Sequence, residues 1–226
     1  MTQRAVLLDL DGTLMHTLPD LDLAANQFLQ EHDLPPLPDG KLADFVGKGS
    51  RDMMTRLLAH VAHEATPARP MPDLDSAVEQ FFEHYHAVNG QHSTVYPGVV
   101  AGLQHWQQTG VRLAVVTNKS MAFAQPLLEQ SGLAPYFDVV VAGDTCSHKK
   151  PHPLPLQYAC EQLGVAPVNA VMVGDSVNDA RAAKAAGMPV LLVPYGYNQG
   201  VDINTLKPTA IVNSVYEAAT GVYWPA

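Results

Sequence analysis

Cysteine is scarce in this chain of 226 residues, which has two, forming neither a Cys-x-x-Cys pair nor a set with zinc-ligand spacing. A disulfide framework and a structural zinc centre are therefore excluded, and a reducing compartment is expected. Long hydrophobic runs are also missing. The apolar stretch near the N-terminus is far too short to cross a bilayer and lacks the pattern of a signal peptide. We expect a cytoplasmic protein that does not associate with membranes.

Basic residues are few as well. The chain has 13 lysines and arginines against 22 aspartates and glutamates, and no local cluster of basic residues offsets the formal charge of −9. Such a field repels polyanions, so we expect no nucleic-acid partner. A small anion is not excluded, because net charge says little about a single pocket. With 47% hydrophobic residues, the chain can bury a core for one or two domains.

Short, almost wholly apolar runs alternate with helical patterns over most of the chain. Such runs suit strands that are covered on both faces, as the strands of parallel sheets are. The runs are residues 4–10, 111–117, 138–142, 170–174 and 189–193. The alternation predicts an α/β fold with a Rossmann-like, doubly wound parallel sheet. After the last run, the sequence indicates a loop and one short edge strand.

Residues 15 to 90 interrupt this alternation. They contain no comparable strand runs, and their patterns predict helices at roughly 18–32, 39–46, 50–64 and 74–89. We therefore expect a core domain of residues 1–14 and 91–226 and an inserted α-helical cap domain of residues 15–90. A cap above the carboxyl edge of the sheet would lie where open α/β folds bind their ligands.

Polar residues follow the predicted strands where each strand ends. Asp9 and Asp11 come directly after the first run. Like charges so close are costly unless a cation lies between them or one is protonated. A turn or helix cap could explain one or two such tips. The other tips carry Thr117 and Asn118, Lys149 and Lys150, and Asp175 and Asp179. Because the tips of parallel strands meet at one edge, a site explains the whole set better.

The chemistry of such a set is narrow. Three or four carboxylates, with room for water and substrate, form a hard-cation site that suits Mg²⁺. A hydroxyl, an amide and a lysine around the ion suit a phosphoryl group. A carboxylate beside a bound phosphate can attack phosphorus and form an aspartyl-phosphate, while its neighbour transfers protons. The pattern predicts a small phosphorylated substrate, with one aspartate as nucleophile and metal ligand and the other as acid and base.

Together the segments "DLDGTL", "VVTN", "KKPHP" and "VGDSVND" resemble, in order and spacing, the haloacid dehalogenase superfamily of phosphohydrolases. The resemblance implies a Rossmann-like core with a helical cap. It implies Asp9 as nucleophile and Asp11 as general acid and base, with Lys150, the lysine directly before the proline, neutralising nucleophile and phosphate. It also implies that Thr117 and Asn118 hold the phosphoryl group. Mg²⁺ would be held by Asp9, the main-chain carbonyl of Asp11 and Asp175, with Asp179 as a further ligand or as a partner of the ligands.

Within this superfamily, "YGYNQG" and the longer segments around the third and fourth motifs are similar to the bacterial phosphoglycolate phosphatases. That resemblance implies Mg²⁺-dependent hydrolysis of 2-phosphoglycolate to glycolate and phosphate. The chain departs from the family at His16 and Thr17, which we expect to have no catalytic role. In "VGKGSRDM", Lys48 or Arg51 would meet the substrate carboxylate if the loop closes over the site, although both are also ordinary solvated cations.

Other functions stay open at this point. A phosphosugar mutase, or a phosphatase for another small metabolite, could use the same core. A dehalogenase would not need Asp11, because halide displacement requires no acid two residues after the nucleophile. A non-catalytic binding module could also keep the fold, although Asp9, Asp11, Lys150 and Asp175 are all present. The sequence favours neither a monomer nor a homodimer.

Overall fold

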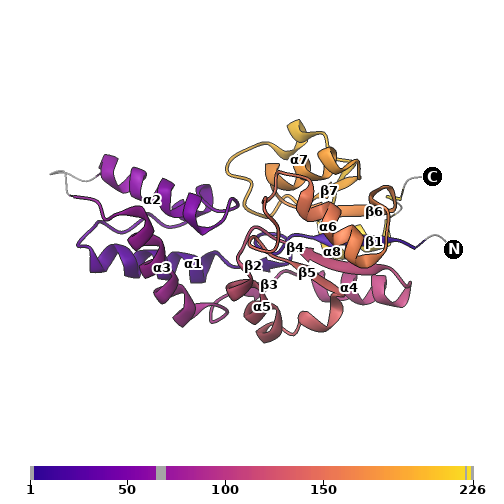
Figure 1. Cartoon of the computed structure of the whole chain (residues 1–226), viewed down its shortest axis with the longest axis horizontal. Helices are drawn as coiled ribbons and strands as arrows, with labels where there is room; N and C mark the ends of the chain where they lie inside the picture. The colour runs from indigo at the N-terminus through magenta and orange to yellow at the C-terminus, as the bar shows by residue number, and fades with distance from the viewer. Residues whose placement is uncertain (1–2, 65–69, 222, 225–226) are drawn as a thin grey trace.

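A six-stranded parallel sheet forms the centre of the larger part of the protein (Figure 1). The structure is a computed structural model, and it describes residues 3–64, 70–221 and 223–224. The strand order is β5-β4-β1-β6-β7-β8. The strands are β1 (Ala5–Leu8), β4 (Arg112–Val116), β5 (Val139–Val141), β6 (Ala170–Gly174), β7 (Val190–Leu192) and β8 (Ala210–Ile211). The predicted doubly wound α/β fold and the short edge strand are confirmed.

Alternate residues of each strand pack into different layers. On one face, Val6 and Leu8 of β1 contact a cluster that includes α4 (Val99–Gln108), α5 (Met121–Gln130) and α8 (Val215–Thr220). On the other face, Ala5 and Leu7 pack with α6 (Leu154–Leu163) and α7 (Val177–Ala186). Burial of both faces explains why the strand sequences are apolar at every position rather than at every second one.

The first strand lies at the point where the order of the sheet reverses. Leu8 pairs with Val115 of β4 on one side and with Val173 of β6 on the other. The three strands therefore end at nearly the same level, and the residues that follow them lie side by side. In a doubly wound sheet this switch point is where ligands bind.

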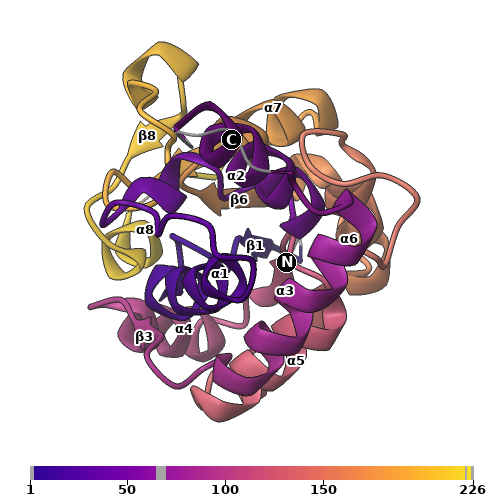
Figure 2. The same cartoon turned by 90° about the vertical axis from the view of Figure 1, so that its left-hand side faces the viewer.

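Helices α1 (Leu18–Glu31), α2 (Ser50–Glu64) and α3 (Leu74–Val88) stand together beyond this edge of the sheet, at the opposite end of the molecule from both termini (Figure 1). In Figure 2 they lie in front of β1 and β6. They form a hydrophobic cluster of their own, to which the rest of the chain adds Phe123 and Tyr197. This cluster supports the predicted division into a core domain of residues 1–14 and 91–226 and a cap domain of residues 15–90, which stays a proposal. Residues 65–69 of the cap lie outside the described part of the chain.

The sequence-based prediction for residues 39–46 was too long. This segment has only a short 3₁₀ helix, η1 (Lys41–Asp44). Its main chain then turns toward the sheet, because the carbonyls of Val46 and Gly47 accept hydrogen bonds from side chains of the larger part. The sequence analysis also missed α8 and the two-stranded antiparallel ribbon of β2 (Met15–His16) and β3 (Thr94–Val95). The ribbon is where the chain enters and leaves the helical part.

Buried Asp20 ties the two crossing segments together next to this ribbon. Its carboxylate accepts hydrogen bonds from the main-chain N–H groups of Gly90, His92 and Ser93 at 2.8–3.0 Å and from the Ser93 hydroxyl. No other side chain of the same size can accept four such bonds, because only a carboxylate has two oxygens and no donor. Asp20 therefore fixes how the helices leave the sheet.

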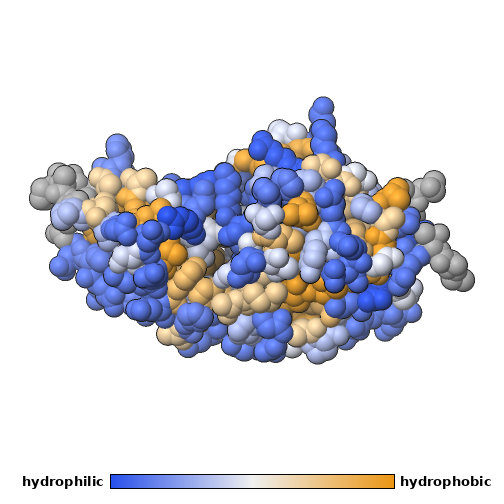
Figure 3. Space-filling view, viewed as in Figure 1, coloured by the Kyte–Doolittle hydropathy of each residue, from blue (hydrophilic) through white to orange (hydrophobic). Residues whose placement is uncertain are grey.

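Figure 3 shows that the surface is hollowed between the two parts of the protein, and that mainly hydrophilic residues border the hollow.

None of the helices in the described part of the chain is both long and apolar enough to pass through a membrane.

Replacing Asp20 by Asn should destabilise the protein by about 1–3 kcal/mol, because an amide nitrogen would face main-chain N–H groups that then lack an acceptor. Urea unfolding at neutral pH measures the change. Asp22→Asn is the matched control on the same helix, where burial, together with the charge of Asp39, raises the pKa of Asp22 to about 6. Because the charged form is disfavoured there, the control should lose no stability. Equal losses in both variants would contradict the role of Asp20.

Candidate active site

Seven of the nine residues that the sequence analysis assigned to the site meet at the carboxyl ends of β1, β4 and β6. Asp9 follows β1, and its main-chain N–H donates to Val173 at 3.0 Å. Asp175 follows β6. Gly12 permits the close approach of these segments, because a Cβ at that position would lie 2.4 Å from a carboxylate oxygen of Asp175. Its φ of +85° is also one that side-chain-bearing residues rarely adopt.

Three carboxylates lie close together in this arrangement. One oxygen each from Asp9, Asp175 and Asp179 falls within 4.8 Å of the others. Burial raises the pKa of Asp9 to about 7, although the charge of Lys150 opposes it. Burial and the charges of Asp9 and Asp179 raise the pKa of Asp175 well above its ordinary value. Protonation, or a cation bound between these groups, would reduce the repulsion between the carboxylates.

Lys150 supplies the positive charge on the inner side of this cluster. Its buried Nζ lies 2.9 Å from Oδ1 of Asp9 and 2.7 Å from Oδ1 of Asp179, and it donates to the carbonyl of Val116 at 2.6 Å. Burial lowers the pKa of Lys150, but the charges of Asp179 and Asp9 outweigh burial and hold it above its usual range. The two carboxylates thus favour the charged form of Lys150.

Asp179 has protein partners for both of its oxygens. Oδ1 faces Lys150, while Oδ2 accepts from the hydroxyl of Ser176 at 2.7 Å and from the main-chain N–H groups of Ser176 and Asp175. The Ser176 hydroxyl in turn caps α7. This arrangement fits the role of a residue that orients Asp175 and Lys150 better than that of a primary metal ligand.

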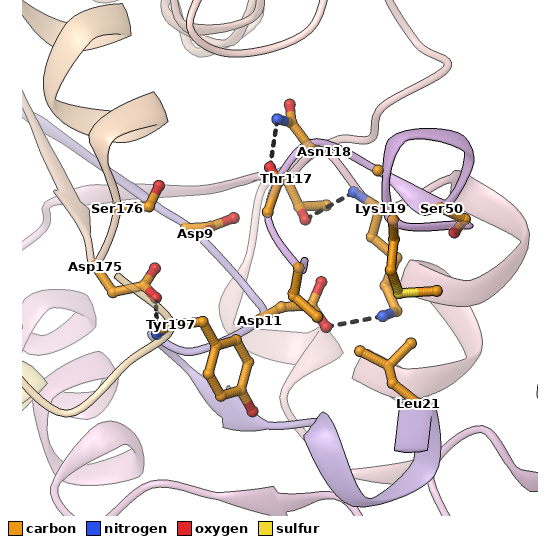
Figure 4. Close-up of a pocket in the computed structure, with 14 residues that line it drawn as sticks. Asp9, Asp11, Leu21, Ser50, Thr117, Asn118, Lys119, Asp175, Ser176 and Tyr197 are labelled. Carbon is orange, nitrogen blue, oxygen red and sulfur yellow. Dashed lines mark hydrogen bonds and ion pairs between the residues drawn. The ribbon is translucent and has the colours of Figure 1, made fainter. Parts of the chain in front are cut away.

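Asp11 points away from Asp9 and Asp175 and toward Lys119 (Figure 4). Its Oδ1 lies 2.8 Å from Nζ of Lys119 and accepts the hydroxyl proton of Thr17 at 2.6 Å. No donor among the described residues reaches its Oδ2. Thr17, a position at which the chain departs from the family, thus contacts Asp11 directly; that His16 and Thr17 have no catalytic role stays a prediction.

The tip of β4 carries two residues with different surroundings. The Thr117 hydroxyl accepts the main-chain N–H of Lys119 at 3.1 Å, so its own proton is free to point elsewhere. The side chain of Asn118 donates to the carbonyls of Gly47 and Lys150 and accepts the N–H of Lys150. Asn118 thus joins the loop that carries Lys150 to the loop that precedes α2. Both of its side-chain groups are engaged, so contact of this side chain with a substrate stays a prediction.

A pocket lies between this sheet edge and the helices. From the sheet side it is lined by Asp9, Asp11, Thr117, Asn118, Lys119, Asp175, Ser176 and Tyr197. Leu21, Val46, Gly47, Gly49, Ser50 and Met53 close it from the helical side. The carbonyl of Gly47 accepts from the side chains of Asn118 and Asn178 at 2.8 and 3.1 Å, which holds this second wall over the carboxylates.

This chain resembles known proteins over almost its whole length. A family model described as haloacid dehalogenase-like hydrolase matches residues 3–187. The chain belongs to that family. A phosphoglycolate phosphatase encoded on a plasmid of Cupriavidus necator is 44% identical over 98% of this chain and 94% of the relative. A phosphoglycolate phosphatase of Thiobacillus denitrificans is 42% identical over 96% and 94%, respectively.

Among solved structures, a predicted phosphoglycolate phosphatase from Haemophilus somnus has a TM-score of 0.91 at 32% identity, covering 96% of this hydrolase and 97% of that chain. These relatives show that the protein is a phosphoric monoester hydrolase with a Rossmann-like core. The predicted family, fold and class of reaction are confirmed.

Lys48 and Arg51 are the two predicted site residues that this hydrolase does not bring to the group of residues at the carboxyl ends of β1, β4 and β6. Lys48 is exposed and is not part of the lining. The side chain of Arg51 is 62% exposed and forms an ion pair with Asp75 on α3. Their contact with a substrate stays a prediction that this conformation does not support.

Lys119 and Tyr197 are two of the lining residues that sequence reasoning missed. Lys119 follows Thr117 by two residues, so the rule that selected the strand tips could have included it. Tyr197 comes from the "YGYNQG" segment. Its N–H donates to Asp175 at 2.5 Å, and its hydroxyl accepts from the N–H groups of Thr17 and Leu18 at 2.8 and 3.0 Å. This residue connects the acidic cluster to the start of α1, a contact that spacing alone does not reveal.

Replacing Asp9 by Asn should stabilise the protein at about pH 8 in the presence of EDTA. The pKa of Asp9 is 3.8 in an unfolded chain and about 7 in the fold. Between these values the folded state binds a proton that the unfolded state has lost, so the free energy of unfolding falls as pH rises and stays low above about pH 7. In the Asp9→Asn variant this group does not titrate, so its free energy of unfolding does not fall in this way.

Urea unfolding of both proteins between about pH 4 and pH 8 measures the effect. The advantage of the variant should grow as pH rises to about 7. A variant that is less stable than the wild type at about pH 8 would contradict this view of the acidic cluster.

Proposed function

We propose that this enzyme hydrolyses 2-phosphoglycolate to glycolate and phosphate through an aspartyl-phosphate, with Mg²⁺ as its cofactor. The observation that carries the proposal is the pairing of Asp9 with Lys150 and Asp175 at one end of the pocket, opposite the pair of Asp11 and Lys119. The relatives named phosphoglycolate phosphatase support the choice of substrate.

The acidic cluster fits a divalent cation. Burial and neighbouring negative charges raise the pKa values of Asp9 and Asp175, so a cation bound between these two carboxylates would be favoured. Oxygen ligands suit Mg²⁺, and the sequence has no comparable nitrogen or sulfur set at these tips. Asp9, Asp175 and the carbonyl of Asp11 would hold the ion, and Asp179 would orient Asp175. When bound, Mg²⁺ would neutralise charge on the phosphoryl oxygens.

Asp9 is the nucleophile in this proposal. Its Oδ1 is held by Lys150, and no donor among the described residues reaches Oδ2, which leaves that oxygen for attack. A bond forms between Oδ2 and phosphorus while the bond from phosphorus to the ester oxygen breaks. Lys150 limits the repulsion between the approaching carboxylate and phosphate, and the hydroxyl of Thr117 donates to a phosphoryl oxygen.

Asp11 moves the protons. In its protonated form it donates from Oδ2 to the ester oxygen, so that glycolate leaves with a neutral hydroxyl group. The resulting carboxylate then takes a proton from a water molecule that attacks phosphorus, which releases phosphate and restores Asp9. Lys119 and Thr17 hold the other oxygen of Asp11, which keeps Oδ2 directed into the pocket.

The alternative within enzymes is a phosphosugar mutase or a phosphatase for another small metabolite. A mutase must keep its aspartyl-phosphate until the sugar has turned over in the pocket and must return the phosphoryl group to it. Stoichiometric release of inorganic phosphate separates the two. Among the described residues that line the helical side of the pocket, Ser50 alone has a polar side chain. This wall offers few partners for several sugar hydroxyls, which favours a small substrate.

The purified enzyme should release inorganic phosphate from 2-phosphoglycolate only when Mg²⁺ is present, and 2-phosphoglycolate should lead a panel of phosphorylated metabolites. Asp9→Asn should lower kcat by more than about a thousandfold, because no other group can take its place as nucleophile.

Asp144→Asn is the matched control. Asp144 is an exposed aspartate that follows β5 near the same edge of the sheet, outside the pocket lining, and its replacement should leave kcat unchanged. Sugar phosphates that react tenfold faster than 2-phosphoglycolate would overturn the substrate assignment, and full activity in EDTA would overturn the role of the metal.

A further inference from the structure

Lys119 lies in the pocket wall opposite the acidic cluster (Figure 4). Its side chain is 6% exposed, and its Nζ makes one ion pair, with Asp11 at 2.8 Å. The ring of Tyr85 lies beneath the ammonium, with 4.9 Å between Nζ and the ring centroid. Burial lowers the pKa of Lys119, but the charge of Asp11 outweighs burial and holds it above the usual range. A permanent positive charge therefore borders the pocket at this point.

The neighbouring cations do not share this position. Lys150 lies behind Asp9, where Asp9 and Asp179 already neutralise it. Among the described residues that line the pocket, Lys119 is the only lysine or arginine. An ammonium group has three donors, of which one faces Asp11. Lys119 thus has both the charge and the free donors to bind a second anionic group of a ligand.

The distances follow from the chemistry of the substrate. Asp11 must lie within hydrogen-bond reach, about 2.6–3.2 Å, of the ester oxygen that it protonates. In a 2-phosphoglycolate molecule the carboxylate carbon is only two covalent bonds from that oxygen. Since Nζ of Lys119 is 2.8 Å from the carboxylate of Asp11, a substrate that engages Asp11 brings its own carboxylate to Lys119.

Resting on the function proposed above, we infer that Lys119 is the residue that selects a carboxylate-bearing substrate, by forming an ion pair with the carboxylate two bonds from the ester oxygen. This assigns to Lys119 the role that the sequence analysis expected of Lys48 or Arg51. Those two side chains lie outside the lining, and Arg51 has a partner in Asp75.

The ion pair between Lys119 and Asp11 also places the ammonium beside the group that transfers the proton in the proposed reaction. A substrate carboxylate bound at Lys119 would therefore hold the ester oxygen next to Asp11. The apolar side chains of Leu21, Val46 and Met53 line the pocket from the helical side, and such surroundings strengthen an ion pair.

Two substrates of equal length separate recognition from chemistry. 2-Phosphoglycolate and 2-hydroxyethyl phosphate share the phosphate ester and the two-carbon chain, and differ in a carboxylate against a neutral hydroxymethyl group. The ratio of their kcat/KM values measures recognition of the carboxylate. Lys119→Met and Lys119→Gln should lower this ratio at least about tenfold, as expected for the loss of a charge-assisted hydrogen bond. Lys119→Arg, which keeps the charge, should retain most of it.

Lys149→Met is the matched control, because Lys149 is an exposed lysine near the same edge of the sheet that does not line the pocket; it should change the ratio less than about twofold. Lys119→Gln keeps an N–H donor near Asp11 and decides the test if the methionine variant does not fold. Thermal unfolding of each variant establishes that it is folded.

Equal losses for both substrates in the Lys119 variants would show that Lys119 acts only through Asp11 and would overturn the inference. A drop in the ratio for Lys48→Met or Arg51→Met, with none for the Lys119 variants, would also overturn it. Failure of the proposed function looks different: the wild-type enzyme itself would then hydrolyse 2-hydroxyethyl phosphate and leave 2-phosphoglycolate unreacted.

Discussion

The mutual repulsion of carboxylates at the end of β1 is the constraint on which the rest of this structure depends. Asp9 and Asp175 follow strands that pair in register, Asp179 lies in the first turn of α7, and one oxygen of each falls within 4.8 Å of the others. Lys150 compensates part of this charge from the buried side. The part of the negative charge that Lys150 does not compensate faces the pocket, where it would favour a bound cation, and that cation would in turn attract an anionic phosphoryl group.

The helical part serves this edge by being fixed to it. Asp20 binds both crossing segments, and Asn118 and Asn178 hold the carbonyl of Gly47. Tyr197 joins Asp175 to the start of α1. Each contact satisfies a buried polar group that would otherwise be costly to remove from water. Together they hold the wall that contains Leu21, Val46 and Met53 opposite the carboxylates, so that the pocket is enclosed between the two parts of the protein.

The sequence predicted the sheet and the strand tips because both rest on local rules. Strands buried on two faces are apolar throughout, and parallel strands end at one edge, so Asp9, Thr117 and Asp175 could be placed together without coordinates. Contacts between distant segments could not be derived in this way. Nothing local in the sequence shows that Arg51 pairs with Asp75, that Thr17 reaches Asp11, or that Tyr197 contacts the helical part. The rule that polar residues at the ends of strands form the site could have included Lys119, but it could not predict the ion pair of Lys119 with Asp11.

The account as a whole stands on Asp9 as the group that accepts the phosphoryl unit. A crystal structure of the protein grown with Mg²⁺ and beryllium fluoride tests this most directly, because trifluoroberyllate binds to a carboxylate as a phosphoryl group would. We expect beryllium bonded to Oδ2 of Asp9, with Lys150 still contacting Oδ1. Beryllium fluoride bound to another residue, or an Asp9 carboxylate left unmodified at saturating beryllium fluoride, would contradict the account.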